Sequence, residues 1–303
     1  MCIVIAKYFE SHGWVAFKNR DRNYIPEISF KKKLAKGVEI LYFWDNVTQY
    51  CEGMNSHGIG VLSASLMVLD DEKEIEIRTR TPSKDGAKIK KALELTNVHD
   101  VAKELIELKL TGSTIIFNQE TCYLLEGAWE KGGYKAEKFR HVIKEIPKDQ
   151  TVVRTNHGVW LPDAGYQRGV NESQTKSRIS SECRKLIAEI VTLTAKTPIE
   201  ILNGLTKDFT HDGQMNALRT STEDKKMRTT SQIMIIPKEQ TMFVRPVQSN
   251  MEFNFWELNR PDQRTWVELL SNRVLYDNLK DNDPNNDPPF DYDLKHTLLG
   301  NAE

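Results

Sequence analysis

The residue best suited to carry out catalysis in this sequence is Cys2, which directly follows Met1. An initiator methionine before a small side chain is normally removed, and its removal would expose the α-amine of Cys2. An α-amine titrates at about pH 8, so a neutral fraction of it accepts the thiol proton at physiological pH. Nucleophile and base would then belong to one residue. Taken alone, Cys2 is explained more simply as a small apolar residue in an edge strand.

A group of polar residues is predicted to lie beside Cys2. Residues 2–9 and 13–18 are rich in apolar and aromatic side chains and are joined by a turn, which predicts a hairpin. A hairpin returns the end of its second strand to the start of its first. The residues expected there are Lys18, Asn19, Arg20 and Asp21. A cation at this place lowers the pKa of a thiol, and Asp21 would orient the α-amine.

With these residues the sequence resembles the linear-amide hydrolases of the N-terminal-nucleophile superfamily. That group includes penicillin V acylases, bile salt hydrolases and acyl-CoA:6-aminopenicillanate acyltransferases, whose bacterial members carry an Arg-Asn-x-Asp motif in place of Lys18-Asn19-Arg20-Asp21. Further matches over about residues 2–250 are the turn from Gly53 to Ile59, Thr155-Asn156-His157, Ser177-Arg178 and Phe209-Thr210-His211-Asp212. The Asn-Arg-Asp triplet also resembles the NRDE-motif family, with Arg22 in place of the glutamate.

The resemblance implies a role for each matching residue. Cys2 is the nucleophile, Asn156 donates to the tetrahedral oxyanion, and Arg178 holds Asp21 bidentately. The residues expected to support substrate or site are Lys18, Asn19, Ser65 and His157. Lys18 departs from the family's arginine and cannot make a bidentate contact. Ser65 is the candidate for the second oxyanion donor, in place of the family's Asn or Tyr.

The order of the elements predicts the fold class. Strands are expected at 38–45 and 58–66, in a hairpin at 113–118 and 121–127, and in another at 230–236 and 240–247. Helices are expected within 84–110, at 173–195, from Pro198 to Leu205 and at 262–279. The helix at 173–195 is expected to have one apolar face, formed by Ile179, Cys183, Leu186, Ile187, Ile190 and Val191. Blocks of strands between blocks of helices favour an α+β fold. With the resemblance, we expect an αββα sandwich of two stacked, mostly antiparallel sheets between helical layers.

Bulk properties limit the class of protein. Among 303 residues, 39% are hydrophobic and 28% charged, and the net charge of −1 gives no reason to expect nucleic acid or a membrane surface as a partner. Four scattered cysteines form no CxxC pair, so neither zinc nor a disulfide framework is expected, and the default location is the cytoplasm. No cofactor motif is present. We expect one domain over residues 1–280 and a polar, acidic tail or arm over 281–303.

The predicted function is a cysteine-dependent hydrolase, or acyltransferase, that cleaves the C–N bond of a small linear amide through a thioester on Cys2. One alternative is a class II glutaminase, although the expected Cys-Gly-Ile start is absent because Ile3 follows Cys2. Another is a non-catalytic binding or trafficking protein of the NRDE type, with a structural Cys2. The acyl group, the amine and the oligomeric state, including a homo-oligomer, stay open.

Overall fold

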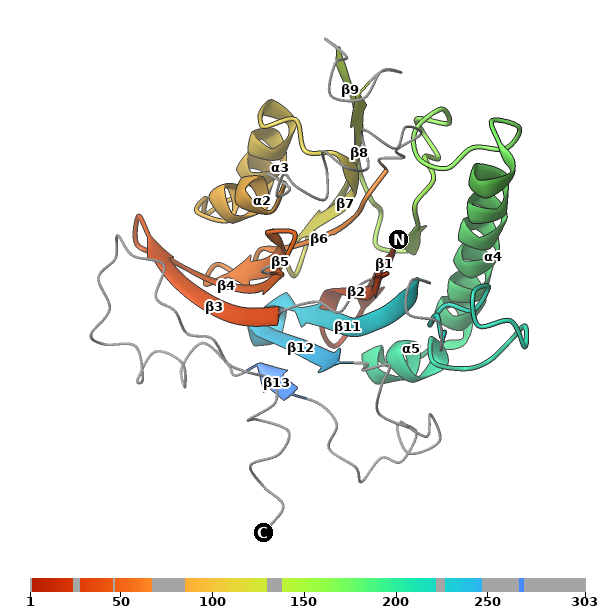
Figure 1. Ribbon diagram of the computed structural model, residues 1–303. Coiled ribbons are helices and arrows are strands. Elements are labelled where there is room, and N and C mark those ends of the chain that lie inside the picture. Colours follow the sequence, from red (N-terminus) through yellow and green to blue (C-terminus); the bar gives the residue numbers. More distant parts are fainter. Residues whose placement is uncertain are drawn as a thin grey trace.

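Two antiparallel sheets lie face to face, and a pair of helices covers the outer face of each (Figure 1). The computed structural model describes residues 2–23, 28–45, 47–66, 85–129, 138–221, 227–246 and 267–269. Sheet A has the strand order β10-β1-β2-β11-β12-β13, and sheet B runs in the order β3-β4-β5-β6-β7-β8-β9. The predicted αββα sandwich is confirmed by this arrangement.

Sheet A is built around the chain's first hairpin. Its strands are β10 (Val152–Arg154), β1 (Cys2–Phe9), β2 (Gly13–Arg22), β11 (Arg228–Ile236), β12 (Thr241–Pro246) and β13 (Val267–Leu269). β1 lies between β10 and β2, so the strand that begins at Cys2 has a hydrogen-bonded neighbour on each side. This pairing fixes the backbone of the candidate nucleophile at the N-terminal end of a strand inside the sheet.

Sheet B is an antiparallel meander, because each strand pairs with the one that follows it. It comprises β3 (Ile28–Ala35), β4 (Val38–Asp45), β5 (Tyr50–Asn55), β6 (Gly60–Ala64), β7 (Gly112–Phe117), β8 (Cys122–Trp129) and β9 (Phe139–Glu145). The helices are α2 (Asp85–Ala92), α3 (Val98–Glu107), α4 (Glu172–Thr194) and α5 (Pro198–Gly204). α2 and α3 cover sheet B, and α4 and α5 cover sheet A (Figure 1).

Three apolar layers hold the sandwich together, and strand alternation assigns each side chain to one of them. Between the sheets, Val4 and Ala6 of β1 pack against residues such as Phe43 and Phe117 of sheet B. On the other face of β1, Ile3 and Ile5 pack against α4 and α5. A third layer joins sheet B to α2 and α3. β1 is therefore buried on both faces, as its continuous apolar run predicts.

Two predictions about helices need correction. Residues 267–269, placed in a helix by the sequence, form β13 and pair with β12, because pairing at a sheet edge overrides local helix preference. The rest of 262–279 and the predicted tail at 281–303 lie outside the described residues. The apolar face predicted for α4 is also only partly buried: Ile187 and Val191 pack on sheet A, whereas the exposed residues of that set are Ile179, Leu186 and Ile190.

Among the helices of the described residues, none combines the length and the apolar character needed to cross a membrane.

Candidate active site

The N-terminal end of β1 brings Cys2 beside the polar end of β2. In the antiparallel register Cys2 lies opposite Arg20, and Val4 lies opposite Lys18. Side chains alternate along a strand, so the even-numbered residues of this part of β2 share the inter-sheet face with Cys2. They are Lys18, Arg20 and Arg22. The odd-numbered Asn19 and Asp21 point toward the helices instead, and the predicted polar group is therefore divided between two faces.

The inter-sheet face carries a buried ionic cluster. Lys18 donates to Glu52 and to the carbonyl of Ser63, 2.7 Å away. Arg20 donates to Asp45 at 2.6 Å, and both of these side chains are fully buried. Since isolated buried charges are strongly disfavoured, cations on β2 require these carboxylates from β4 and β5. The cluster thus ties sheet A to sheet B directly behind the nucleophile.

Arg22 is the cation that reaches the sulfur. Its Nη1 lies 3.5 Å from Sγ of Cys2 and donates to the carbonyl of Asp21 at 2.7 Å. Burial raises the pKa of the Cys2 thiol, but the charges of Lys18, Arg22 and the amino terminus together outweigh burial and lower it to about 7. A substantial fraction of the thiol is then ionised at neutral pH, as nucleophilic attack requires.

Asp21 pairs with Arg184, and the predicted pairing with Arg178 is wrong. Arg184 of α4 lies 2.5 Å from Asp21, and both side chains are fully buried. Thr229 of β11 donates to the same carboxylate at 2.8 Å. Arg178 instead donates to Glu182 and to the carbonyl of Tyr166. The two arginines are six residues apart, or about 120° around a helix of 3.6 residues per turn, so only one can face the sheet.

A second arginine, Arg219, interacts electrostatically with Asp21 and Arg184 and was not predicted. Its guanidinium donates to Ser180, while Nε and Nη1 have no hydrogen-bond partner among the described residues. Burial and the like charge of Arg184 lower the pKa of Arg219 to about 9, so it is still protonated at pH 7. Neither Arg184 nor Arg219 belongs to a motif that carries the resemblance, and only the folded chain brings their charges close to Asp21.

Asn19 lies on the same helix-facing side. Its amide donates to the carbonyl of Ala217 at 2.8 Å and accepts from Gln232 of β11 at 2.9 Å. Both contacts are internal to the protein. Asn19 therefore connects β2 to the segment that carries Arg219, and a direct role toward substrate stays a prediction.

Asn156, just after β10, contacts the backbone of the nucleophile. Its Oδ1 accepts from the Cys2 N–H at 2.6 Å, and its Nδ2 donates to the carbonyl of Ser65 at 2.7 Å. The two contacts fix the orientation of the amide, because one needs an acceptor and the other a donor. Ser65 meets Asn156 through its carbonyl oxygen, which accepts; its assignment as an oxyanion donor stays a prediction.

The loop after Asn156 is held by a buried carboxylate. Glu126 of β8 accepts from the backbone N–H groups of Val159, Trp160 and Leu161 and from the side chain of Arg154. An ionised carboxylate that accepts several backbone donors is a strong, directional anchor. Sheet B thereby fixes the loop that carries the candidate oxyanion donor.

His157 faces away from the thiol. Its Nδ1 lies 2.9 Å from Ser181 Oγ of α4 and 3.1 Å from Thr155 Oγ1. Burial, followed by the charge of Arg178, lowers the pKa of His157 to about 4, so the ring is neutral at pH 7. His157 and Arg178 line a hollow of about 340 Å³ between α4 and the loop that follows Asn156. The structure thus brings His157 and Arg178 together, but at a place separate from Asp21.

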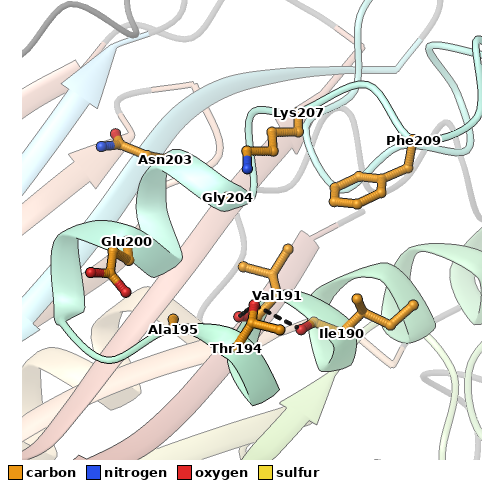
Figure 2. Close-up of a pocket in the computed structure, with 9 residues that line it drawn as sticks. All are labelled: Ile190, Val191, Thr194, Ala195, Glu200, Asn203, Gly204, Lys207 and Phe209. Atoms are coloured by element: carbon orange, nitrogen blue, oxygen red, sulfur yellow. Dashed lines mark hydrogen bonds between the residues drawn. The ribbon is translucent and has the colours of Figure 1, made fainter.

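A second hollow, of about 370 Å³, lies between the C-terminal end of α4 and α5 (Figure 2). Lys7, near the far end of β1, donates to the carbonyls of Thr192 and Ala195 at this end of α4. Cys2 begins β1, so the hollow lies at the opposite end of that strand. None of its lining residues belongs to the group around Cys2. Among the described residues, no cluster of His, Cys, Asp and Glu side chains is suited to hold a metal ion.

Solved structures with a similar backbone course include the following two. One is a penicillin V acylase from Agrobacterium tumefaciens, 11% identical, with a TM-score of 0.46 over 81% of this chain and 83% of the other. The other is a mutant conjugated bile acid hydrolase from Clostridium perfringens, 13% identical, with a TM-score of 0.46 over 82% and 90%. No model of a protein family and no curated protein matches the chain.

Proposed function

We propose that this protein is a cysteine-dependent hydrolase of linear amides that forms a thioester on Cys2. The observation that carries the proposal is the contact between two segments far apart in the sequence. The Asn156 amide accepts from the Cys2 N–H while the Cys2 thiol has a pKa lowered to about 7. A nucleophile with a depressed pKa beside a fixed amide donor suits acyl transfer.

Acylation begins when the Cys2 thiolate attacks the amide carbonyl. The new C–S bond pushes the carbonyl electron pair onto oxygen, and the second Nδ2 hydrogen of Asn156 is the donor we assign to that oxyanion. Its first hydrogen is held by the carbonyl of Ser65. When the C–N bond breaks, the leaving nitrogen takes a proton from the α-ammonium of Cys2, exposed by loss of Met1. The product is a thioester and a free amine.

Hydrolysis of the thioester reverses these roles. The neutral α-amine takes a proton from water, the hydroxide oxygen attacks the thioester carbonyl, and the thiolate leaves as the carboxylic acid forms. An acceptor amine in place of water gives acyl transfer by the same steps. In this scheme Asp21, with Arg184 and Arg219, holds the end of β2 beside the N-terminus of β1. Linear amides are proposed as substrates because the motifs of the chain resemble those of linear-amide hydrolases.

The test combines intact mass with labelling. The purified protein is weighed before and after brief exposure to a thiol-reactive acyl donor, and the adduct is mapped by peptide digestion. We expect loss of Met1 and one adduct on Cys2, followed by turnover in a panel of N-acyl amides. Cys2→Ala should abolish both labelling and turnover, and Cys183→Ala, a cysteine outside the site, serves as the matched control. Equal turnover by Cys2→Ala, or labelling spread over the other cysteines, would contradict the proposal and favour a non-catalytic binding protein.

A further inference from the structure

We infer that Arg22 is a catalytic residue that holds the Cys2 sulfur as a thiolate before substrate binds. The inference deepens the proposed function and rests on it for its catalytic meaning. Nη1 of Arg22 lies 3.5 Å from Sγ, within hydrogen-bonding distance for sulfur. Because a guanidinium stays protonated at all physiological pH values, this donor carries a permanent charge.

Lys18, one of the cations that the sequence places beside Cys2, is engaged elsewhere. Its ammonium donates to Glu52 and to the carbonyl of Ser63, and it lies over the ring of Tyr50 at 5.2 Å from the centroid. An ammonium has three donors, and two of them are used by these oxygens. Lys18 therefore acts on the sulfur through its field, whereas Arg22 makes the contact.

Arg22 is held in place from the opposite sheet. Its Nε lies 3.6 Å from Asp45 of β4, and its Nη1 donates to the carbonyl of Asp21. Asp45 also accepts from Arg20. A guanidinium fixed at two points loses little further entropy when it contacts the sulfur. The side chain is 14% exposed, so it also borders solvent, from which an amide would approach.

The charges that face Cys2 favour an anion at the sulfur. Among the described residues of the inter-sheet face, β2 supplies three cations, Lys18, Arg20 and Arg22, and β4 and β5 supply two carboxylates, Asp45 and Glu52. A thiolate at Cys2 balances this cluster. On the helix-facing side, Asp21 opposes ionisation of the thiol, but it is paired with Arg184, and Arg219 adds a further positive charge. Tyr50 stays neutral, because burial and Glu52 raise its pKa.

The consequence concerns the thiol proton. With the thiolate stabilised by Arg22, a substantial fraction of the molecules has already passed that proton to the α-amine or to solvent before the amide arrives. The α-amine then enters the reaction protonated, ready to donate to the leaving nitrogen. The lowered pKa of Cys2 agrees with this order of events.

The experiment measures the alkylation rate of Cys2 by iodoacetamide from pH 5 to 10, with the adduct mapped by mass spectrometry. The unmodified chain should show a midpoint at about 7. Arg22→Gln should raise the midpoint by roughly one unit, which makes alkylation at pH 6 about tenfold slower. Arg22→Lys should recover most of the difference. Arg168→Gln, which removes an exposed arginine paired with Glu182, is the charge-matched control and should behave as the unmodified chain.

If the pH profile of Cys2 alkylation is the same for Arg22→Gln as for the unmodified chain, the inference is overturned. If that variant does not fold, thiolate absorbance near 240 nm is compared between the unmodified chain and Cys2→Ser. At pH 8 roughly nine-tenths of Cys2 should be thiolate, and its absence would also overturn the inference. Alkylation needs no amide turnover. A midpoint that depends on Arg22 in a protein that cleaves no amide would therefore refute the proposed function, and with it the catalytic role, while leaving the stabilisation of the thiolate by Arg22 intact.

Discussion

The two faces of β2 carry alternate residues of one short sequence, yet they do different work. On the inter-sheet face, Lys18, Arg20 and Arg22 meet carboxylates from sheet B, and the last of them reaches the thiol. On the helix-facing side the order of charges is inverted, since one carboxylate, Asp21, lies beside the guanidinium groups of Arg184 and Arg219. The first face tunes a nucleophile, and the second fixes the end of the strand that presents it.

The two faces of β2 differ in how many charged groups each contains, and this difference predicts which substitutions affect reactivity and which affect stability. The inter-sheet cluster has several carboxylates and several cations, so removal of one group leaves the others partly paired. On the helix-facing side a single carboxylate compensates buried arginines. We therefore expect substitutions on the helix-facing side to act mainly on folding and substitutions on the inter-sheet face to act mainly on reactivity.

Asp21→Asn should show the largest effect. It leaves Arg184 buried without its carboxylate, and breaking a buried pair in this way costs about 3–5 kcal/mol. Urea unfolding followed by circular dichroism measures the loss. Glu172→Gln, which removes an exposed carboxylate at the start of α4, is the control and should change stability by less than about 0.5 kcal/mol. If Asp21→Asn lowers the free energy of unfolding by no more than Glu172→Gln does, the helix-facing side of β2 does not have the stabilising role assigned to it.

Asn156→Ala tests the donor that approaches the nucleophile from β10. It removes the acceptor of the Cys2 N–H and the proposed oxyanion donor, and kcat/KM should fall about 10²–10³-fold. Alkylation of Cys2 should change far less, because the cations of β2 remain. Asn203→Ala in α5 is the matched control and should retain full activity. Equal losses in alkylation and turnover would assign Asn156 to positioning of Cys2 alone.

His157 predicts a pH dependence of stability with a definite sign. Its pKa is lowered in the folded state to about 4, so the unfolded chain binds the proton more tightly between pH 6.5 and 4. The free energy of unfolding should therefore be fully retained above pH 6.5 and fall by about 2–3 kcal/mol as the pH drops to 4. His157→Gln should flatten this part of the curve, and His211→Asn, at an exposed histidine, should not. A curve that His157→Gln leaves unchanged would contradict the assignment.

Lys7→Met should show the smallest effect, at the end of β1 remote from Cys2. The Lys7 ammonium donates to two carbonyls at the C-terminus of α4, a favourable place for a cation. Its loss should lower stability by about 1 kcal/mol and leave turnover and Cys2 alkylation unchanged. Thermal unfolding and the alkylation profile measure both quantities. A shifted alkylation midpoint would show that the two ends of β1 are coupled.

The hairpin that places Cys2 opposite the polar end of β2 could be predicted from its apolar runs and the turn at Gly13. The alternation of side chains along a strand also predicts that Arg22 and Asp21 lie on opposite faces of β2. The pairing of Asp21 could not be predicted in this way. The pairing depends on which side of α4 faces sheet A. The apolar residues Leu186 and Ile190 predicted a buried side that is exposed in the structure.

Several strands of sheet B were also missed. β3 contains Lys31, Lys32 and Lys33, a charged run that does not predict a strand, and it lies at the edge of the sheet, where lysine is common. β9 is the opposite edge and carries charged residues of both signs, Arg140, Lys144 and Glu145. Edge strands lack the continuous apolar run that identifies β1, so their place comes from pairing with neighbours and not from their own composition.

Because Cys2 and Asn156 are separated by 154 positions, their contact can form only late in the life of a nascent chain. At roughly 5–20 residues per second, a ribosome needs on the order of ten to thirty seconds to produce the second partner after the first. Until then the nucleophile lacks the Asn156 amide, although the cations of β2 have already been synthesised. Amide turnover, and not alkylation of Cys2, would therefore report the moment at which sheet A closes around its first strand.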